Sequence, residues 1–298
     1  MLYALFVSRM SFDSPATAPT ATYPSTRITR LTELWFHTGT ACNLECPFCL
    51  EGSKPADTRL ERIKLADVQP LMQEAISLGV QRFAFTGGEP LIVKDIVKIL
   101  EYALSLKPCL LLTNGTAPLL KRAHQLELLK KQAHPLSFRV SIDYPDEGQH
   151  DAGRGWGNFK RAIDGMKILH ERAFAVSIAR QVRPAEDATE ITNRFRELLR
   201  KHHLPVDTAI TALPDFGRPG MKAPVPIAAT PEGLRTLMCT HSRMAVKANG
   251  CMRVYACPFV DDDTNFDLGD SLATASSSAV RLQHHRCNVC IQHRASYS

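Results

Sequence analysis

The sequence predicts an α/β fold, in which helices cover a parallel β-sheet. Between residues 33 and 213, apolar runs of strand length alternate with segments that carry apolar residues at helical spacing. The alternation gives six strands separated by five helices, and a succession of this kind builds a parallel sheet. Of the 298 residues, 44% are hydrophobic and 22% are charged, so a sizeable core is available. The pattern alone allows an open doubly wound sheet or a barrel.

Each expected element follows from the pattern of its own segment. The strands are apolar runs bounded by turn residues, and we expect them at residues 33–38, 80–86, 109–113, 136–142, 175–182 and 206–213. The helices repeat apolar residues three and four positions apart, and we expect them at residues 65–78, 93–106, 119–132, 159–172 and 188–202. In either architecture, the active site lies on the loops that follow the carboxyl ends of the strands.

The composition changes after residue 214 and divides the chain into segments. Residues 31–214 hold the alternating pattern, and residues 215–233 form a linker rich in Pro and Gly. Residues 234–298 show little helical or strand periodicity but contain five cysteines, which predicts a small cysteine-rich domain. Residues 1–30 are rich in Ser, Thr, Ala and Pro, and we expect a disordered leader or an early start codon there rather than a targeting segment.

Charge and cysteine usage narrow the functional class. The formal net charge is +6, and the basic runs are short and lie near the ends of predicted helices. Solvated helix ends are therefore favoured over a nucleic-acid partner. No apolar stretch approaches the roughly 18 residues that a membrane span needs. Eight of the nine cysteines fall in two short regions, which indicates metal binding in a reducing cytoplasm rather than disulfides.

The first cysteine group follows the first expected strand. Cys42, Cys46 and Cys49 have the spacing C-x3-C-x2-C, with an aromatic residue, Phe48, before the third cysteine. Three thiolates can hold three corners of a [4Fe–4S] cluster and leave one iron open to a small molecule. A zinc site is the alternative, although zinc sites usually close with four ligands.

Polar motifs follow the next three expected strands. They are Gly87-Gly88-Glu89-Pro90, Thr113-Asn114-Gly115 and Ser141-Ile142-Asp143. With the cysteine group, their order and spacing over residues 32–213 resemble the radical S-adenosylmethionine (radical SAM) enzymes. The resemblance implies a partial (β/α)6 TIM-like barrel. It also implies reductive cleavage of S-adenosylmethionine to a 5′-deoxyadenosyl radical, which abstracts a hydrogen atom from the substrate. A flavodoxin- or ferredoxin-type protein would donate the electron.

The same resemblance assigns residues to the cofactor. It implies that Cys42, Cys46 and Cys49 hold the cluster, and that S-adenosylmethionine contacts Phe48, Gly87, Gly88, Glu89, Asn114, Ser141 and Asp143. Phe48 would lie near the adenine, and the Gly-Gly-Glu segment would contact the methionyl amino group. For each position a structural role, as packing aromatic, turn or satisfied strand-end group, stays open. Arg154 could clamp an anionic group or form an ordinary ion pair. The sequence identifies no catalytic acid or base.

The second cysteine group lies near the end of the chain and comprises Cys239, Cys251, Cys257, Cys287 and Cys290. Its spacing resembles the auxiliary-cluster module called twitch, which is related to the larger SPASM module and holds one further iron–sulfur cluster. The resemblance favours Cys239, Cys257, Cys287 and Cys290 as ligands of a second [4Fe–4S] cluster. Cys251 is the alternative to Cys257. A zinc site is the other alternative, because His241, His285 and His293 lie nearby.

Three functions are therefore compared. A compact chain with a twitch-like module suits dehydrogenation or epimerisation of a small molecule, such as a sugar, an aminocyclitol or a nucleotide. A peptide or protein maturase of the same superfamily is the first alternative. A non-catalytic iron–sulfur or zinc redox sensor is the second, but a sensor has no need of the Gly-Gly-Glu-Pro segment.

Overall fold

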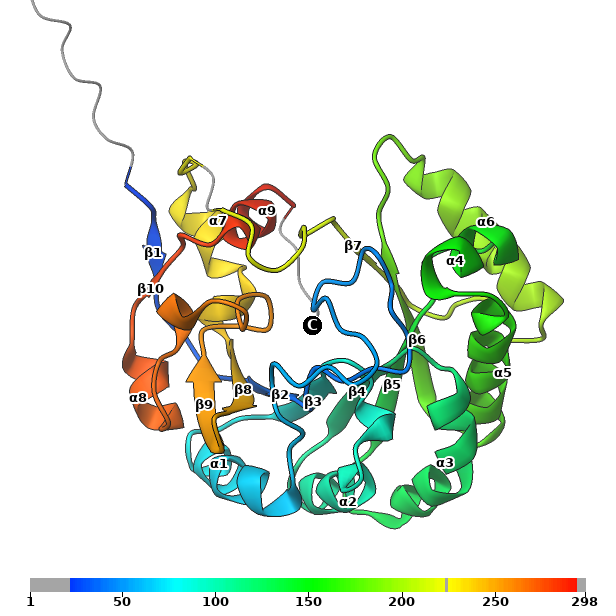
Figure 1. Ribbon diagram of the computed structural model, residues 1–298, viewed down its shortest axis with the longest axis horizontal. Helices are drawn as coiled ribbons and strands as arrows, with labels where there is room; N and C mark the ends of the chain where they lie inside the picture. The colour runs from blue at the N-terminus through cyan, green and yellow to red at the C-terminus, as the bar shows by residue number, and fades with distance from the viewer. Residues whose placement is uncertain (1–21, 223–224, 294–298) are drawn as a thin grey trace, which may run out of the picture.

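The computed structural model describes residues 22–222 and 225–293, and a curved eight-stranded sheet forms its centre (Figure 1). The predicted parallel strands are present as β2 (Glu33–His37), β3 (Arg82–Thr86), β4 (Cys109–Thr113), β5 (Leu136–Ser141), β6 (Ala175–Gln181) and β7 (Ile210–Leu213). They pair in sequence order, each parallel to the next. This confirms the predicted α/β fold with a parallel sheet.

Helices cover the convex side of this sheet (Figure 1). They are α1 (Leu65–Ser77), α2 (Ile96–Leu106), α3 (Ala117–Leu128), α5 (Asn158–Glu171) and α6 (Ala188–Lys201). In α1 the buried positions Val68, Leu71, Met72 and Ala75 recur at helical spacing and join the core. Two helices end or begin at other residues than expected. A 3₁₀ turn, Pro90–Ile92, precedes α2, which starts at Ile96 rather than at residue 93. Another 3₁₀ turn, Leu129–Lys131, follows α3, which ends at Leu128 rather than at residue 132.

The register brings the carboxyl ends of the strands to one edge. His37 at the end of β2 lies opposite Thr86 at the end of β3. Farther along the sheet, Ser141 at the end of β5 lies opposite Ala179 in β6. The loops that carry the cysteine triad and the polar motifs all leave the sheet at this edge, so residues distant in sequence meet there.

The C-terminal segment contains strands and helices that its weak sequence periodicity did not indicate. Its hairpin, β8 (Ser242–Ala248) and β9 (Cys251–Tyr255), extends the main sheet, with β8 parallel to β2 and β9 antiparallel to β8. Nearly every residue of β8 is buried, so the strand lacks the alternation by which a half-exposed strand is recognised. Helices α7 (Pro231–Arg235), α8 (Leu272–Ser277) and α9 (His285–His293) and two 3₁₀ turns, Met238–Thr240 and Thr264–Phe266, complete this segment.

Two further segments are more ordered than the sequence indicated. Residues 1–21 of the expected leader lie outside the described residues, but β1 (Ser25–Thr26) pairs antiparallel with β10 (Val280–Arg281). A helix, α4 (Glu147–Arg154), forms where a loop was expected, and the Asp146 carboxylate caps it by accepting a hydrogen bond from the Gln149 N–H at 2.9 Å. Within the described ranges, no helix is long and apolar enough to cross a membrane.

Candidate active site and second cysteine centre

The first cysteine group lines a cavity at the carboxyl edge of the sheet. Cys42, Cys46 and Cys49 lie in the loop after β2 and face residues from the following strands across this cavity. The other lining residues include Phe48, Glu51, Gly87, Gly88, Thr113, Asn114, Ser141, Asp143, Arg154, Arg180 and Gln181. Every site residue predicted for the first group therefore lies here except Glu89, which is absent from the lining.

The two glycines after β3 let the cysteine loop approach the sheet closely. Gly87 has a φ of +128°, which favours glycine, and a Cβ on Gly88 would lie 2.0 Å from the carbonyl oxygen of Ala41. The Gly88 N–H donates to the carbonyl of Gly39 at 2.9 Å, and the Glu89 N–H donates to that of Ala41 at 3.1 Å. The glycines thus have a packing role at the cysteine loop in addition to lining the cavity.

Glu89 is buried behind the cavity, where it joins the ends of β3 and β4. Its carboxylate accepts hydrogen bonds from the Leu91 N–H (3.1 Å), the Thr113 hydroxyl (2.9 Å) and the Asn114 N–H (2.8 Å). Burial raises the pKa of Glu89 to about 7, against the effect of these donors. In this structure the carboxylate braces the ends of β3 and β4, and its contact with the methionyl amino group stays a prediction.

Asn114 connects β4 with the cysteine loop. Its side-chain nitrogen donates to the Asn43 side chain at 3.0 Å and lies 3.9 Å from the Cys42 sulfur. Its side-chain oxygen accepts from the Thr116 hydroxyl at 2.6 Å. The amide is therefore fixed in orientation beside the first thiol.

A buried ion pair lies beside the Phe48 ring and forms part of the same cavity wall. The Arg154 Nε lies 2.5 Å from an Asp143 carboxylate oxygen, and the guanidinium lies 5.7 Å from the centre of the Phe48 ring. Burial alone would raise the pKa of Asp143, but Arg154 outweighs it and holds this pKa below its ordinary value. Arg154 also lies close enough to Cys46 to favour the thiolate. Arg154 thus forms an ion pair in the cavity. The helix α4 positions Arg154, and this helix was not predicted from the sequence.

The donor set fits a metal centre. Burial raises the pKa of the Cys42 thiol to about 12 and also raises those of Cys46 and Cys49, so the thiolates need a cation in this cavity. All three cysteines are free. Three converging soft ligands with an open side suit an iron–sulfur cluster with one accessible iron.

The second cysteine group lines a separate, smaller cavity. Cys239, Cys257, Cys287 and Cys290 are all buried and line it together. Cys251 is exposed at the start of β9 and does not line this cavity. No histidine is among its lining residues in the described part of the chain. The structure thus brings together the four favoured cysteines and leaves Cys251 apart.

Two buried arginines lie beside this second cavity, and neither was predicted from the sequence. Arg243 belongs to β8, and Arg286 directly precedes Cys287 in α9. Arg286 donates to the carbonyl of Leu50 at 2.7 Å and to that of Phe259 at 2.9 Å. Because Leu50 follows Cys49, Arg286 joins the two cysteine-bearing segments. In the sequence, only the position of Arg286 next to Cys287 indicated that it lies at the second cysteine group.

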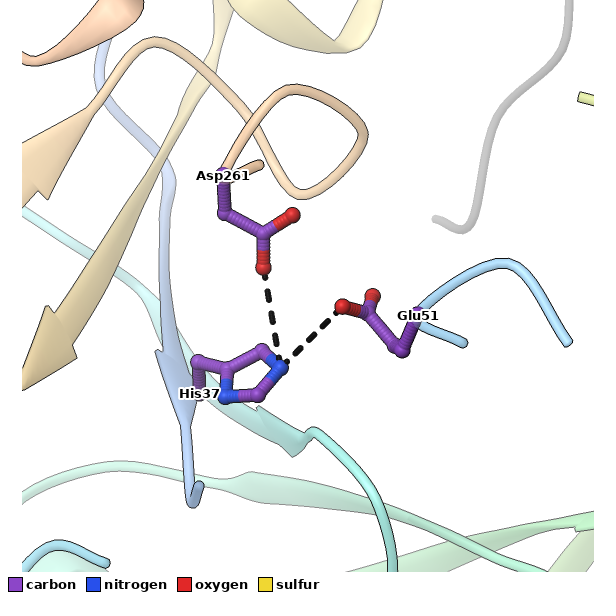
Figure 2. A group of neighbouring side chains, drawn as sticks. All are labelled: His37, Glu51 and Asp261. Carbon is purple, nitrogen blue, oxygen red and sulfur yellow. Dashed lines mark hydrogen bonds and ion pairs between the residues drawn. The ribbon is translucent and has the colours of Figure 1, made fainter. Parts of the chain in front are cut away.

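A group of His37, Glu51 and Asp261 also lies between the two segments (Figure 2). The His37 Nε2 is 3.2 Å from a Glu51 carboxylate oxygen and 3.6 Å from one of Asp261. The Gly39 N–H donates to the His37 Nδ1 at 3.2 Å, so the proton of a neutral imidazole is on Nε2. Metal-bound histidines normally carry a proton on the nitrogen that does not bind the metal. The group is therefore a hydrogen-bonded link rather than a cation site.

Comparisons with known proteins agree with this geometry. The model of the Radical SAM superfamily matches residues 36–183. The chain is 30% identical to the subtilosin biosynthesis protein AlbA of Bacillus subtilis over 47% of this chain and 31% of AlbA. It is 27% identical to a GTP 3′,8-cyclase of Actinobacillus pleuropneumoniae over 45% of this chain and 38% of the cyclase. The matches thus span about a third of the length of these curated relatives.

A solved structure extends the likeness to nearly the whole fold. Native anSMEcpe, with bound AdoMet and a peptide named Kp18Cys, superposes with a TM-score of 0.59 at 13% identity. The superposition covers 88% of this chain and 83% of that chain. At this identity the likeness establishes the fold alone.

Proposed function

The chain belongs to the radical SAM superfamily, whose members are enzymes that use a [4Fe–4S] cluster with S-adenosylmethionine, and we propose that Cys42, Cys46 and Cys49 hold this cluster. When bound, the cofactor pair supplies an electron and a 5′-deoxyadenosyl radical for hydrogen abstraction. The convergence of the three thiols with Phe48, Asn114, Ser141 and Asp143 on one cavity carries this proposal.

The protein groups around the cavity bind and orient. The Phe48 ring and the Arg154 guanidinium form one wall, and the Asp143 carboxylate holds Arg154 in place. The Asn114 amide, fixed by Asn43 and Thr116, presents its nitrogen beside Cys42. Gly87 and Gly88 provide a surface without side chains, which a cofactor can approach closely. These groups are proposed to recognise S-adenosylmethionine.

We also propose a second, auxiliary [4Fe–4S] cluster held by Cys239, Cys257, Cys287 and Cys290. The support is their shared buried cavity and the two guanidinium groups beside it, which suit a negatively charged metal–thiolate centre. A four-cysteine zinc site has the same charge, but its metal cannot accept an electron. Iron in this site would allow the enzyme to oxidise a substrate radical. We place the reaction in a reducing cytoplasm with a flavodoxin- or ferredoxin-type donor.

For the substrate we propose a small molecule, such as a sugar, an aminocyclitol or a nucleotide, that is dehydrogenated or epimerised. The similarity to GTP 3′,8-cyclase, whose name specifies a nucleotide, supports this class. A peptide is the second candidate, because AlbA is named for bacteriocin biosynthesis and anSMEcpe was solved with a peptide. Mass spectrometry after incubation with peptides encoded beside the gene separates the two: a change of peptide mass selects the second.

Iron content and cofactor cleavage test the two-cluster assignment. Anaerobically reconstituted protein should contain about eight irons per chain and form 5′-deoxyadenosine on reduction. The Cys42→Ala, Cys46→Ala, Cys49→Ala variant should keep about four irons and form no 5′-deoxyadenosine. Cys251→Ser is the matched control and should retain both properties, because Cys251 is exposed and apart from both cavities. Formation of 5′-deoxyadenosine by the triple variant would contradict the assignment.

A further inference from the structure

Arg243 carries a buried positive charge without a carboxylate partner. Its side chain is fully buried in β8, and no carboxylate pairs with it within the described part of the chain. Two other arginines of this segment are paired with a carboxylate: Arg286 lies 3.4 Å from Asp262, and Arg253 lies 2.8 Å from Asp267. Burial of an unpaired charge is costly, so an anion is expected close to Arg243.

The hydrogen bonds of Arg243 lead to the second cysteine cavity. Its Nη1 donates to the carbonyls of Cys239 (2.8 Å), Ser242 (2.9 Å) and Ala256 (3.1 Å). Ala256 precedes Cys257, so one guanidinium holds the backbone beside two of the four cysteines. Its Nη2 is buried and has no hydrogen-bond partner among the described residues.

The groups that can balance this charge are the thiols themselves. Arg243 donates to the carbonyl of Cys239 and to that of Ala256, the neighbour of Cys257, so these two cysteines lie beside the guanidinium. An arginine guanidinium keeps its charge in folded proteins, so this buried group needs a counter-charge. Metal-bound thiolates would compensate the charge, whereas neutral thiols or a disulfide would leave it unbalanced.

We propose that Arg243 is the internal counter-charge of the auxiliary centre, a positioning residue that holds Cys239 and Cys257 and favours the reduced state of the centre. This rests on the proposed second cluster. Reduction adds negative charge to an already anionic cluster, and a fixed positive charge nearby stabilises the product more than the starting state. Net charge and local hydrogen bonding are known determinants of cluster potential.

A redox titration in a background without the first cluster tests the proposal. The Cys42→Ala, Cys46→Ala, Cys49→Ala protein is reconstituted with iron and sulfide, and the auxiliary centre is titrated by electron paramagnetic resonance. Adding Arg243→Gln should make the reduction potential of the centre more negative by about 59 mV. For a one-electron couple, this shift corresponds to a tenfold change in the oxidised-to-reduced ratio. Arg243→Lys keeps the charge and should shift it less. Arg253→Gln, which removes a paired charge from the same hairpin, should shift it least.

The outcomes separate this proposal from the one on which it rests. About four irons in the background protein support the auxiliary cluster, and absence of iron overturns both proposals. With iron present, equal potentials in the Arg243→Gln and Arg253→Gln proteins overturn the role of Arg243 alone. If Arg243→Gln fails to hold iron, retention of iron by Arg243→Lys supports the role of the charge. Loss of iron from both variants overturns it.

Discussion

At the scale of single residues, buried polar groups join the chain segments that form the two cavities. Glu89 joins β3 to β4, Asn114 joins β4 to the cysteine loop, and Arg286 joins that loop to the second cysteine group. Removal of one partner of such a buried hydrogen bond leaves the other unsatisfied, at a cost of about 1–3 kcal/mol. The geometry of the cavity therefore depends on residues behind its surface as well as on those that line it.

Glu89 makes the stability of the metal-free protein depend on pH. Its pKa rises from 4.5 to about 7 on folding, because burial disfavours the carboxylate. The folded state therefore binds the proton more tightly. The resulting stabilisation is complete below pH 4.5 and is lost as pH rises to about 7. Over this range the free energy of unfolding of the wild type should fall by about 3 kcal/mol more than that of Glu89→Gln, because the glutamine side chain has no proton to release.

Urea unfolding of both metal-free proteins at pH 4.5 and pH 7.5 measures this difference. Glu89→Gln is less stable by a pH-independent amount, because its amide cannot accept from all three donors. Only the change between the two pH values reports the titration. Parallel stability curves for wild type and variant would exclude Glu89 as the titrating group.

Sequence patterns could identify the proposed ligand residues but not the residues that position them. The cysteine spacing and the strand-end motifs are local, so they can be read from short segments. His37 and Asp261, in contrast, are more than 200 positions apart and meet only because β8 lies beside β2. Arg243 resembles a surface residue in sequence, and its burial follows from the hairpin that the pattern did not reveal.

At the scale of elements, α4 is the part of the site that the sequence did not predict as a helix. It is short, polar and contains Gly148 and Gly153, which lower helix propensity. The cap at Asp146 was the available signal. Its position matters because it carries Arg154 and packs Gly153 against Phe48.

The two glycines of α4 offer a matched pair of substitutions. A Cβ on Gly153 would lie 2.3 Å from the Phe48 ring, whereas one on Gly148 meets nothing closer than 3.5 Å. Gly153→Ala should displace the ring from the cavity wall and weaken S-adenosylmethionine binding about tenfold, or 1.4 kcal/mol. Gly148→Ala should leave affinity unchanged and stabilise the protein by about 0.5–1 kcal/mol.

Calorimetric titration of S-adenosylmethionine into both reconstituted variants checks this prediction. Urea unfolding of the same proteins shows whether Gly153→Ala retains the fold. Equal affinities for the two variants would show that Phe48 does not contribute to the binding site.

At the scale of the whole molecule, the C-terminal segment and the barrel share a core. Trp35 of β2, Ala84 of β3 and Leu110 of β4 pack in one cluster with Met244 and Val246 of β8. The same cluster contains Cys239, Cys257, Cys287 and Cys290. The side of the sheet that faces the second cysteine centre is therefore completed by residues from both ends of the chain.

A shared core predicts that barrel and C-terminal segment unfold together. Trp35 is fully buried in this core and Trp156 is 89% exposed, and the sequence contains no other tryptophan. In a Trp156→Phe protein, fluorescence therefore reports Trp35 alone, while far-ultraviolet circular dichroism reports the helices of the barrel. Urea should produce coincident transitions by both probes, because loss of the hairpin exposes the apolar surface and one edge of β2 together. An earlier fluorescence transition, with the helices intact, would instead identify the C-terminal segment as an independently unfolding domain.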